Sequence, residues 1–209
     1  MSNPQLIIRR LGLRDYEPVW REMQAFTQAR DADTPDELWL VEHPPVYTFG
    51  LNAKPEHLRD AGAIPVVRCD RGGQVTYHGP GQMVVYCLID LRRLGLGVKN
   101  FVQQLEQSVI DLLADYGVTG ERQVSAPGVY VNGAKIAALG LRITRGASYH
   151  GIAFNVDMDL GPFARINPCG YPGMAVTQLA ALAAGIDRAA IAEQLLRRLV
   201  QNLGVFAVQ

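Results

Sequence analysis

The run from Met83 to Leu91, MVVYCLIDL, constrains the fold more than any other stretch of the sequence. Side chains of a strand point alternately to its two faces. The two resulting sets are both apolar, with Val85, Cys87 and Ile89 on one face and Val84, Tyr86 and Leu88 on the other. A strand that is apolar on both faces is typical of the interior of a sheet. We therefore expect this run to be a central strand.

The neighbouring segments alternate irregularly between strand and helix patterns. Strands are expected near 6–11, 38–42, 46–50, 128–131, 135–143 and 149–156, and helices over 16–29, 98–116, 177–184 and 188–203. Asn132-Gly133 predicts a hairpin turn, and Asp187 and Gly204 are suited to cap the last helix. Because regular βαβ units are missing from this order, we expect one α+β domain over residues 1–209, a mixed sheet flanked by helices.

Charge and composition restrict the classes of partner. The chain has 20 Lys and Arg against 20 Asp and Glu, so no overall charge favours nucleic acid or a membrane surface. No run of about 18 apolar residues predicts a spanning helix, and the first residues do not have a secretory signal pattern. The three cysteines contain no CxxC motif, which favours free thiols in the reducing cytoplasm.

The segment RGGQVTYHGPGQ, residues 71–82, contains four glycines and a proline beside an arginine and a histidine. One interpretation is a glycine-rich turn between two strands. The other is a loop whose backbone must come close to a ligand, because glycine has no side chain and permits unusual φ. The segment alone does not decide between the two.

Cys169 lies in INPCGYPGM, where prolines and glycines on both sides predict a loop. Loops carry function more often than buried strands do, so Cys169 is a candidate nucleophile, whereas Cys69 and Cys87 are expected to be structural. A reactive thiolate needs a base or a nearby cation. His78, His150 and Lys135 are candidates, although Lys135 could also be an edge lysine that discourages sheet pairing.

Several well-known motifs are missing from the sequence. There is no GxxxxGK[ST] phosphate loop, no GxGxxG after a strand and no GxSxG elbow. His78, His150 and Cys169 could formally bind a metal, but no short-range pair of ligands supports this, and we expect none.

Four segments together resemble one enzyme family. RGGQVTYHGPGQMVVY, GVYVNGAKIAALGLRI, GIAFNVDMDL and INPCGYPGMAVTQL are similar, in order, to segments of the lipoyl(octanoyl) transferases. The similarity covers roughly residues 38–183. It implies the α+β fold shared by biotin and lipoate protein ligases.

The resemblance also implies an activity. Octanoyltransferases move an octanoyl group from the phosphopantetheine of acyl carrier protein to one lysine of a lipoyl domain, through a cysteine thioester. The acceptors implied are 2-oxoacid dehydrogenases and the glycine-cleavage H protein, and no ATP, metal or other cofactor is implied. The open alternatives are an ATP-dependent lipoate or octanoate ligase of the same fold, a non-catalytic lipoyl-domain or carrier-binding protein, and a thioesterase.

Residue by residue, the family pattern assigns the acyl-accepting thiol to Cys169 and its activating lysine to Lys135. The segments that would bind the acyl group are Arg71, Gly72, Gly73, Gln74, Val75, Thr76, Tyr77 and His78, then Ala138, Leu139 and Gly140, and finally Gly151, Ile152 and Ala153. Arg71 could hold a backbone carbonyl or attract the acidic carrier. A basic rim for that carrier could include Arg68, Arg71, Arg92, Arg93, Arg142, Arg145 and Arg165, although scattered solvated charges would fit equally well.

Overall fold

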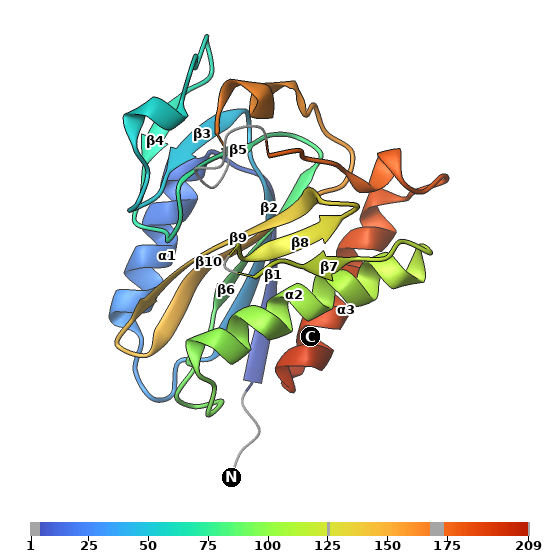
Figure 1. Ribbon diagram of the computed structural model, residues 1–209. Helices are drawn as coiled ribbons and strands as arrows, with labels where there is room; N and C mark the ends of the chain where they lie inside the picture. Colours follow the sequence, from blue (N-terminus) through green and yellow to red (C-terminus); the bar gives the residue numbers. More distant parts are fainter. Residues whose placement is uncertain (1–4, 125, 168–173, 209) are drawn as a thin grey trace.

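The computed structural model describes residues 5–124, 126–167 and 174–208 (Figure 1). The elements follow in the order β1 (Gln5–Leu13), α1 (Tyr16–Ala29), β2 (Asp36–Glu42), β3 (Val46–Phe49), η1 (Pro55–His57), β4 (Val66–Arg68), β5 (Val75–His78), β6 (Gln82–Leu88), α2 (Val98–Asp115), β7 (Glu121–Arg122), β8 (Gly128–Val131), β9 (Ala134–Thr144), β10 (Ala147–Asn155), η2 (Gly161–Arg165), η4 (Leu179–Ala181), α3 (Arg188–Leu203) and β11 (Phe206–Val208).

The main sheet has the strand order β11-β1-β2-β6-β10-β9-β8-β7 within the described residues. β1 pairs in parallel with β11 and β2, and the pairs from β2 through β6, β10, β9 and β8 to β7 are antiparallel. β6 therefore lies inside the sheet, as its two apolar faces predicted. The mixed sheet flanked by helices confirms the predicted fold class.

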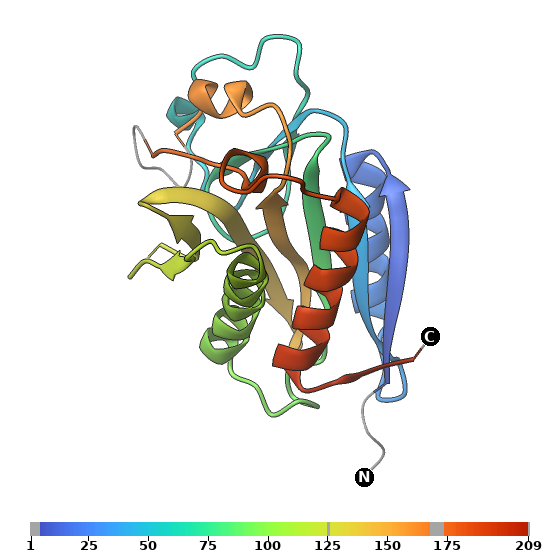
Figure 2. The ribbon, with the colours of Figure 1, turned by 90° about the vertical axis from the view of Figure 1, so that its right-hand side faces the viewer.

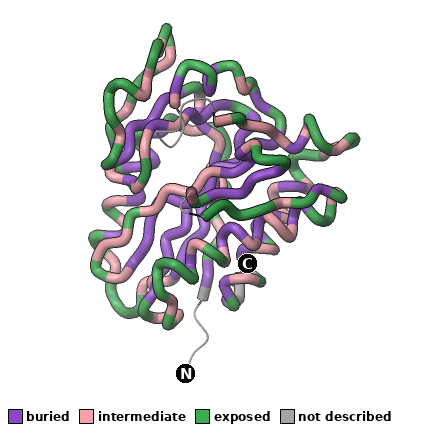
Figure 3. The backbone as a smooth tube through the Cα atoms, viewed as in Figure 1, coloured by how far each residue is buried: buried purple, intermediate pink, exposed green. Residues whose placement is uncertain are grey.

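Helices cover both faces of this sheet, as Figures 1 and 2 show. α2 and α3 cover one face, where a large apolar cluster includes Val85 and Cys87 of β6. α1 covers the other face, where a smaller cluster includes Val84, Tyr86 and Leu88 of the same strand. The central strands are the most continuously buried part of the chain (Figure 3).

A second sheet, in the order β4-β3-β5, lies beside the first and was not expected from the sequence. β5 pairs antiparallel with β3, and this pairing holds the end of the glycine-rich segment. Its short strands have too few residues for a clear period-two pattern, which is why β4 was assigned no structure.

The expected helices at 16–29 and 188–203 are confirmed, with Asp187 accepting a hydrogen bond from the amide of Ala189 and Gly204 at φ 64°. The helix expected over 177–184 is wrong. That segment forms only the single turn η4, since the amide of Ala180 bonds to Val156 O instead of continuing a helix.

Candidate functional site

The glycine-rich segment crosses the edge of β9 and then enters β5. Gly72 donates its amide to Leu141 O at 2.8 Å, and a Cβ on Gly72 would lie 3.1 Å from that same oxygen. A Cβ on Gly50, in the facing loop, would lie 2.5 Å from Gly73 O. Close contact between backbones thus requires glycine at Gly50 and favours it at Gly72.

Arg71 is a buried clamp for this loop, with only 7% of its surface exposed. Its Nη2 donates to Thr48 O at 2.6 Å and to Gln74 O at 2.7 Å, and its Nη1 donates to Gly72 O at 3.0 Å. Of the two roles considered, the structure shows the contact with backbone carbonyls. The guanidinium group is committed to these contacts and does not form part of a solvent-exposed basic rim.

Beneath the clamp lies a pocket on the α1 face of the main sheet. It has about 520 Å³ of empty space, part of it open to solvent. All of the predicted acyl-binding residues except Gly72 and Tyr77 line it. Gly72 instead faces β9, and Tyr77 packs on the other side of β5 in a cluster with Tyr47 and Phe163.

The pocket also includes residues that the sequence patterns did not single out for a site. These are Tyr16, Val84 and Tyr86, while His150 had been considered as a base for the thiol or a metal ligand and not as part of the acyl pocket. The alternation of β6 places Val84 and Tyr86 on the same face, so the sequence did contain a signal that these two residues lie together. Nothing local to Tyr16 indicates that the start of α1 meets the glycine-rich segment.

A chain of buried hydrogen bonds runs from Arg71 under the pocket. Thr48 Oγ1 accepts from Arg71 and lies 3.4 Å from His78 Nε2, while His78 Nδ1 lies 2.7 Å from Gln82 Oε1. Gln82 donates to Asn155 Oδ1 at 2.9 Å. Burial lowers the pKa of His78 to about 3, so the ring is neutral at physiological pH and donates from Nδ1.

This hydrogen-bonded chain ends beside Lys135. Asn155 Nδ2 donates to Thr177 O at 3.0 Å, and the amide of Thr177 donates to Lys135 O at 2.9 Å. The amide of Lys135 in turn donates to Ala175 O at 2.8 Å. Residues 175–177 are therefore fixed along the first part of β9. Cys169 itself lies outside the described residues, and its role stays a prediction.

Lys135 points to the pocket face of the sheet because β9 contains a bulge. Val129 and Tyr130 are consecutive in β8, yet they pair with Ala137 and Lys135, so Ile136 is an extra residue. Ile136 and Ala137 both join the α2–α3 core, whereas Lys135 Nζ lies 5.1 Å from the ring centroid of Tyr130. Regular alternation would place Lys135 and Ala138 on opposite faces; the bulge places them on the same face.

Lys135 is 4% exposed, and its Nζ donates to Pro127 O at 3.2 Å. This burial excludes the interpretation of Lys135 as a solvated edge lysine. A buried amino group is the environment in which a lysine can act as a base.

His150 is turned toward the pocket by a different irregularity. Its φ is 60°, a left-handed conformation that is uncommon outside glycine. It consequently stacks on its neighbour Tyr149, with ring centroids 5.0 Å apart, and both side chains bond to Asp70. His150 is 1% exposed, and its Nδ1 has no hydrogen-bond partner among the described residues.

Asp70 anchors this side of the pocket. It accepts hydrogen bonds from Trp20 and Gln24 of α1 and from Tyr149 and His150 of β10. Although partial burial opposes it, these bonds hold the pKa of Asp70 well below its usual range. Burial lowers the pKa of His150 despite Asp70. The neutral ring therefore donates from Nε2 to the carboxylate, at 3.0 Å, and presents the lone pair of Nδ1.

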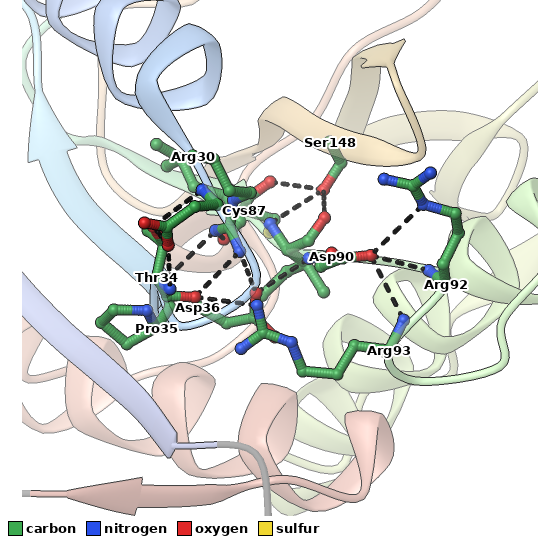
Figure 4. Close-up of polar contacts among 12 residues, drawn as sticks. Arg30, Thr34, Pro35, Asp36, Cys87, Asp90, Arg92, Arg93 and Ser148 are labelled. Carbon is green, nitrogen blue, oxygen red and sulfur yellow. Dashed lines mark hydrogen bonds and ion pairs between the residues drawn. The ribbon is translucent and has the colours of Figure 1, made fainter.

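The arginines considered for a carrier rim do not form one patch. Arg92 and Arg93 lie around Asp90, which follows the C-terminal end of β6. The buried ion pair Arg30–Asp36 lies beside them (Figure 4). Arg145 donates to the C-terminal carbonyls of α1. A single basic rim around the pocket is therefore not supported.

Within residues 5–124, 126–167 and 174–208, no cluster of three or more His, Cys, Asp or Glu side chains could bind a metal ion. In the same described residues, no helix is long and apolar enough to cross a membrane.

Comparison with known proteins gives consistent matches. Residues 15–200 match the family model of the lipoyl protein ligase A/B catalytic domain. The chain is 60% identical over 203 residues to an octanoyltransferase of Aromatoleum aromaticum, covering 97% of this chain and 87% of that protein. It is 66% identical over 176 residues to an octanoyltransferase of Thiobacillus denitrificans, covering 84% and 81%.

The fold is similar to a solved structure of a bi-partite lipoate protein ligase from Thermoplasma acidophilum. The TM-score is 0.75 at 14% identity, and the match covers 100% of this chain and 88% of that one. At this low identity the similarity concerns the fold, and it confirms the prediction of a lipoate-ligase-like fold.

Proposed function

We propose that this chain, which belongs to the lipoyl protein ligase A/B catalytic domain family, is an octanoyltransferase acting as one catalytic domain. It moves an octanoyl group from octanoyl-acyl carrier protein to a specific lysine of a lipoyl domain. The observation that carries the proposal is the pocket, whose lining matches three separate segments of the family pattern.

The pocket suits a thin, uncharged chain. The apolar surface that would exclude water from an alkyl group comes from Val84 and from the rings of Tyr16 and Tyr86, whereas the side chains of Leu139 and Ile152 point to the α2–α3 core. Ala138, Gly140, Gly151 and Ala153 have at most a methyl group as side chain. An alkyl chain can therefore lie close to the backbones of β9 and β10.

In the first half-reaction, the Cys169 thiolate attacks the carbonyl carbon of the octanoyl thioester. A bond from Cys169 sulfur to that carbon forms and the bond to the carrier sulfur breaks. Lys135 accepts the Cys169 proton and passes it to the departing carrier thiolate. One thioester replaces another, so the step requires little free energy.

In the second half-reaction, the amine of the lipoyl-domain lysine attacks the acyl-enzyme. The amide bond forms, the bond to Cys169 sulfur breaks, and Lys135 transfers the amine proton to the departing thiolate. An amide is less activated than a thioester, so this step runs downhill. Neither half needs a nucleotide or a metal, and we propose that the enzyme uses no cofactor.

The acceptors we propose are the lipoyl domains of 2-oxoacid dehydrogenases and the glycine-cleavage H protein. We also propose that the reaction takes place in the cytoplasm, because it depends on a reduced thiol at Cys169.

Intact-protein mass spectrometry tests the proposal directly. The protein is incubated with octanoyl-acyl carrier protein without ATP, mapped by peptide, and then mixed with a lipoyl domain. We expect one octanoyl adduct on Cys169 that the domain removes, with the label appearing on the domain lysine.

The matched variants are Cys169→Ala and Cys87→Ala. Burial raises the pKa of the Cys87 thiol to about 12, so its loss should not affect the adduct. Octanoylation of the domain only when free acid and ATP are supplied would contradict the proposal and indicate a ligase. Release of free octanoate without transfer would indicate a thioesterase.

A further inference from the structure

A carboxylate is buried in α2, the helix that covers the face of the sheet opposite the pocket. Glu106 lies at helical spacing from Val102, Val109 and Leu113, so it interrupts a stripe of α2 that is otherwise apolar. Only 5% of its surface is exposed. A buried carboxylate is costly without hydrogen-bond partners, so the surroundings of Glu106 must supply them.

Both carboxylate oxygens of Glu106 accept hydrogen bonds. Oε1 accepts from the amide of Gly128 at 2.9 Å, and Oε2 accepts from Arg122 Nε at 3.1 Å. The side chain of Arg122 is 37% exposed, so it neutralises the carboxylate from the solvent side. The bond to Gly128 is buried, and it directs the carboxylate at a single peptide group.

That peptide group contacts Lys135 with its other end. Its N–H belongs to Gly128 and its C=O to Pro127, and this oxygen accepts from Lys135 Nζ at 3.2 Å. In a trans peptide the N–H and the C=O point in opposite directions. The Pro127–Gly128 peptide therefore connects the carboxylate of α2 to the amino group on the pocket face.

The backbone at Gly128 permits this connection but does not fix it. Gly128 has φ 142°, in a region that favours glycine, and a Cβ there would lie 2.7 Å from Ala137 O. Glycine is thus required, and it also lets the preceding peptide adopt other orientations. Turning the peptide would take its N–H away from Glu106 and leave both buried groups without their partner, which is costly. Glu106 therefore selects the orientation in which Pro127 O faces Lys135.

The same bond also strengthens the contact with Lys135. Hydrogen bonds in series polarise one another, so a peptide that donates from its N–H is a better acceptor at its oxygen. The effect is larger where one partner is charged and water is excluded. Pro127 O is accordingly both held in place and made a stronger acceptor for the amino group.

We propose that Glu106 is a positioning residue for Lys135 and acts through the Pro127–Gly128 peptide. It fixes where the amino group lies while protons are transferred. This inference rests on the proposed function, in which Lys135 moves the protons of both half-reactions. Glu106 acts from the far side of the peptide group and is not itself a catalytic residue.

The test compares Glu106→Leu with the wild type in single-turnover transfer from the octanoyl-enzyme to a lipoyl domain, followed by intact mass. Misplacing a reacting group by about 1 Å can lower a rate roughly 10²-fold. We expect the maximal rate to fall between about 10-fold and about 10²-fold. The domain concentration that gives half the maximal rate should not change, because Glu106 lies outside the surface that binds the domain.

A double-mutant cycle separates positioning from a general effect on the fold. In a Lys135→Met background there is no amino group to position, so Glu106→Leu should lower the remaining rate no further. Ser108→Ala is the matched control on α2. Ser108 is completely buried and donates to the carbonyl of Gln104 at 2.9 Å. Its loss should reduce stability in urea and leave the rate per folded molecule unchanged.

Two further variants separate the hydrogen bond from the charge, and they keep the test decisive if Glu106→Leu does not fold. Glu106→Asp keeps the charge but shortens the side chain by one carbon, so the carboxylate withdraws from Gly128 and the rate should fall. Glu106→Gln combined with Arg122→Ala keeps an acceptor for Gly128 and removes the donor that would oppose the glutamine amide. This double variant should retain most of the wild-type rate.

The outcomes distinguish failure of this inference from failure of the proposed function. If the wild type forms no octanoyl adduct, the proposed function is wrong, and this inference with it. If the wild type transfers octanoyl groups and Glu106→Leu or Glu106→Asp does so at the same rate, only this inference is wrong. It is also wrong if Glu106→Leu causes an equal loss in the Lys135→Met background, because Glu106 would then only stabilise the start of β8.

Discussion

The two faces of the main sheet bury different kinds of side chain. The face under α2 and α3 is an apolar core in which side chains such as Leu105 and Leu195 are completely buried. The face under α1 buries His43, His78 and His150 as well as Arg71 and Lys135. Strand β6 contributes to both. The comparison shows that one strand can contribute to an apolar core on one side and to the lining of a pocket with buried polar groups on the other.

The largest expected effect is on the pocket face. Lys135→Met should reduce octanoyl transfer by roughly 10²–10⁴-fold, the usual contribution of a general base. The fold should survive, because methionine fills a similar volume in a buried site. Single-turnover rates from acyl-enzyme to lipoyl domain would measure this.

Ile136→Val is the matched control for that variant. It changes the next residue, which points to the opposite face, and should cost roughly 0.5–1.5 kcal/mol of stability with no change in the rate per folded molecule. Near-normal turnover in Lys135→Met would show that the pocket face does not depend on this lysine.

The core face should show the reverse behaviour. Leu195→Ala in α3 removes a completely buried side chain and should lower the free energy of unfolding by roughly 2–5 kcal/mol. The transfer rate per folded molecule should stay the same at a temperature where the variant is folded. Urea unfolding and kinetics on the same preparation would measure both. A lower transfer rate per folded molecule in this variant would contradict the separation of the two faces.

Acid should weaken the pocket face first. Burial lowers the pKa of His43 to about 4 and that of His78 to about 3, against about 6.5 in an unfolded chain. The unfolded chain therefore binds more protons below pH 6.5, and stability that is present above pH 6.5 is lost as the pH falls toward the folded pKa values. Each histidine contributes a slope of up to about 1.4 kcal/mol per pH unit.

Urea midpoints between pH 7.5 and 4.5 would reveal this slope. His43→Gln should flatten it, even if the variant is less stable at pH 7.5. An equally steep slope in that variant would mean that His43 is not held neutral in the folded protein. The carboxylate of Asp70 adds little over this range, because the stability that its lowered pKa contributes is lost only as the pH falls from about 5 toward that pKa.

The smallest expected effect is at the start of α3. Asp187 caps this helix by accepting from the amide of Ala189 at 2.9 Å. Asp187→Ala should cost roughly 0.5–2 kcal/mol of stability and leave transfer unchanged. Thermal unfolding would measure the loss, and Asp187→Asn should restore most of it.

Sequence patterns predicted the regular parts of both faces well. The alternation in β6 and the bounds of α1 are correct because a sheet interior and an amphipathic helix leave strong periodic signals. The irregular parts left weaker signals. The bulge at Ile136 and the positive φ of His150 depend on pairing with distant strands, and the contact of Tyr16 with the pocket depends on how α1 packs. The short strands β4, β5, β7 and β11 were missed for the same reason.

The bulge in β9 limits which mutations this enzyme can tolerate as its sequence evolves. The direction of Lys135 depends on the number of residues between it and Ala138, rather than on which residues they are. Many substitutions at Ile136 would keep the lysine in place, but loss of that single residue would restore regular pairing with β8 and turn the amino group into the core. If Lys135 has the proposed role, loss of that one residue would inactivate the enzyme, so insertions and deletions are the changes that this strand can least accept.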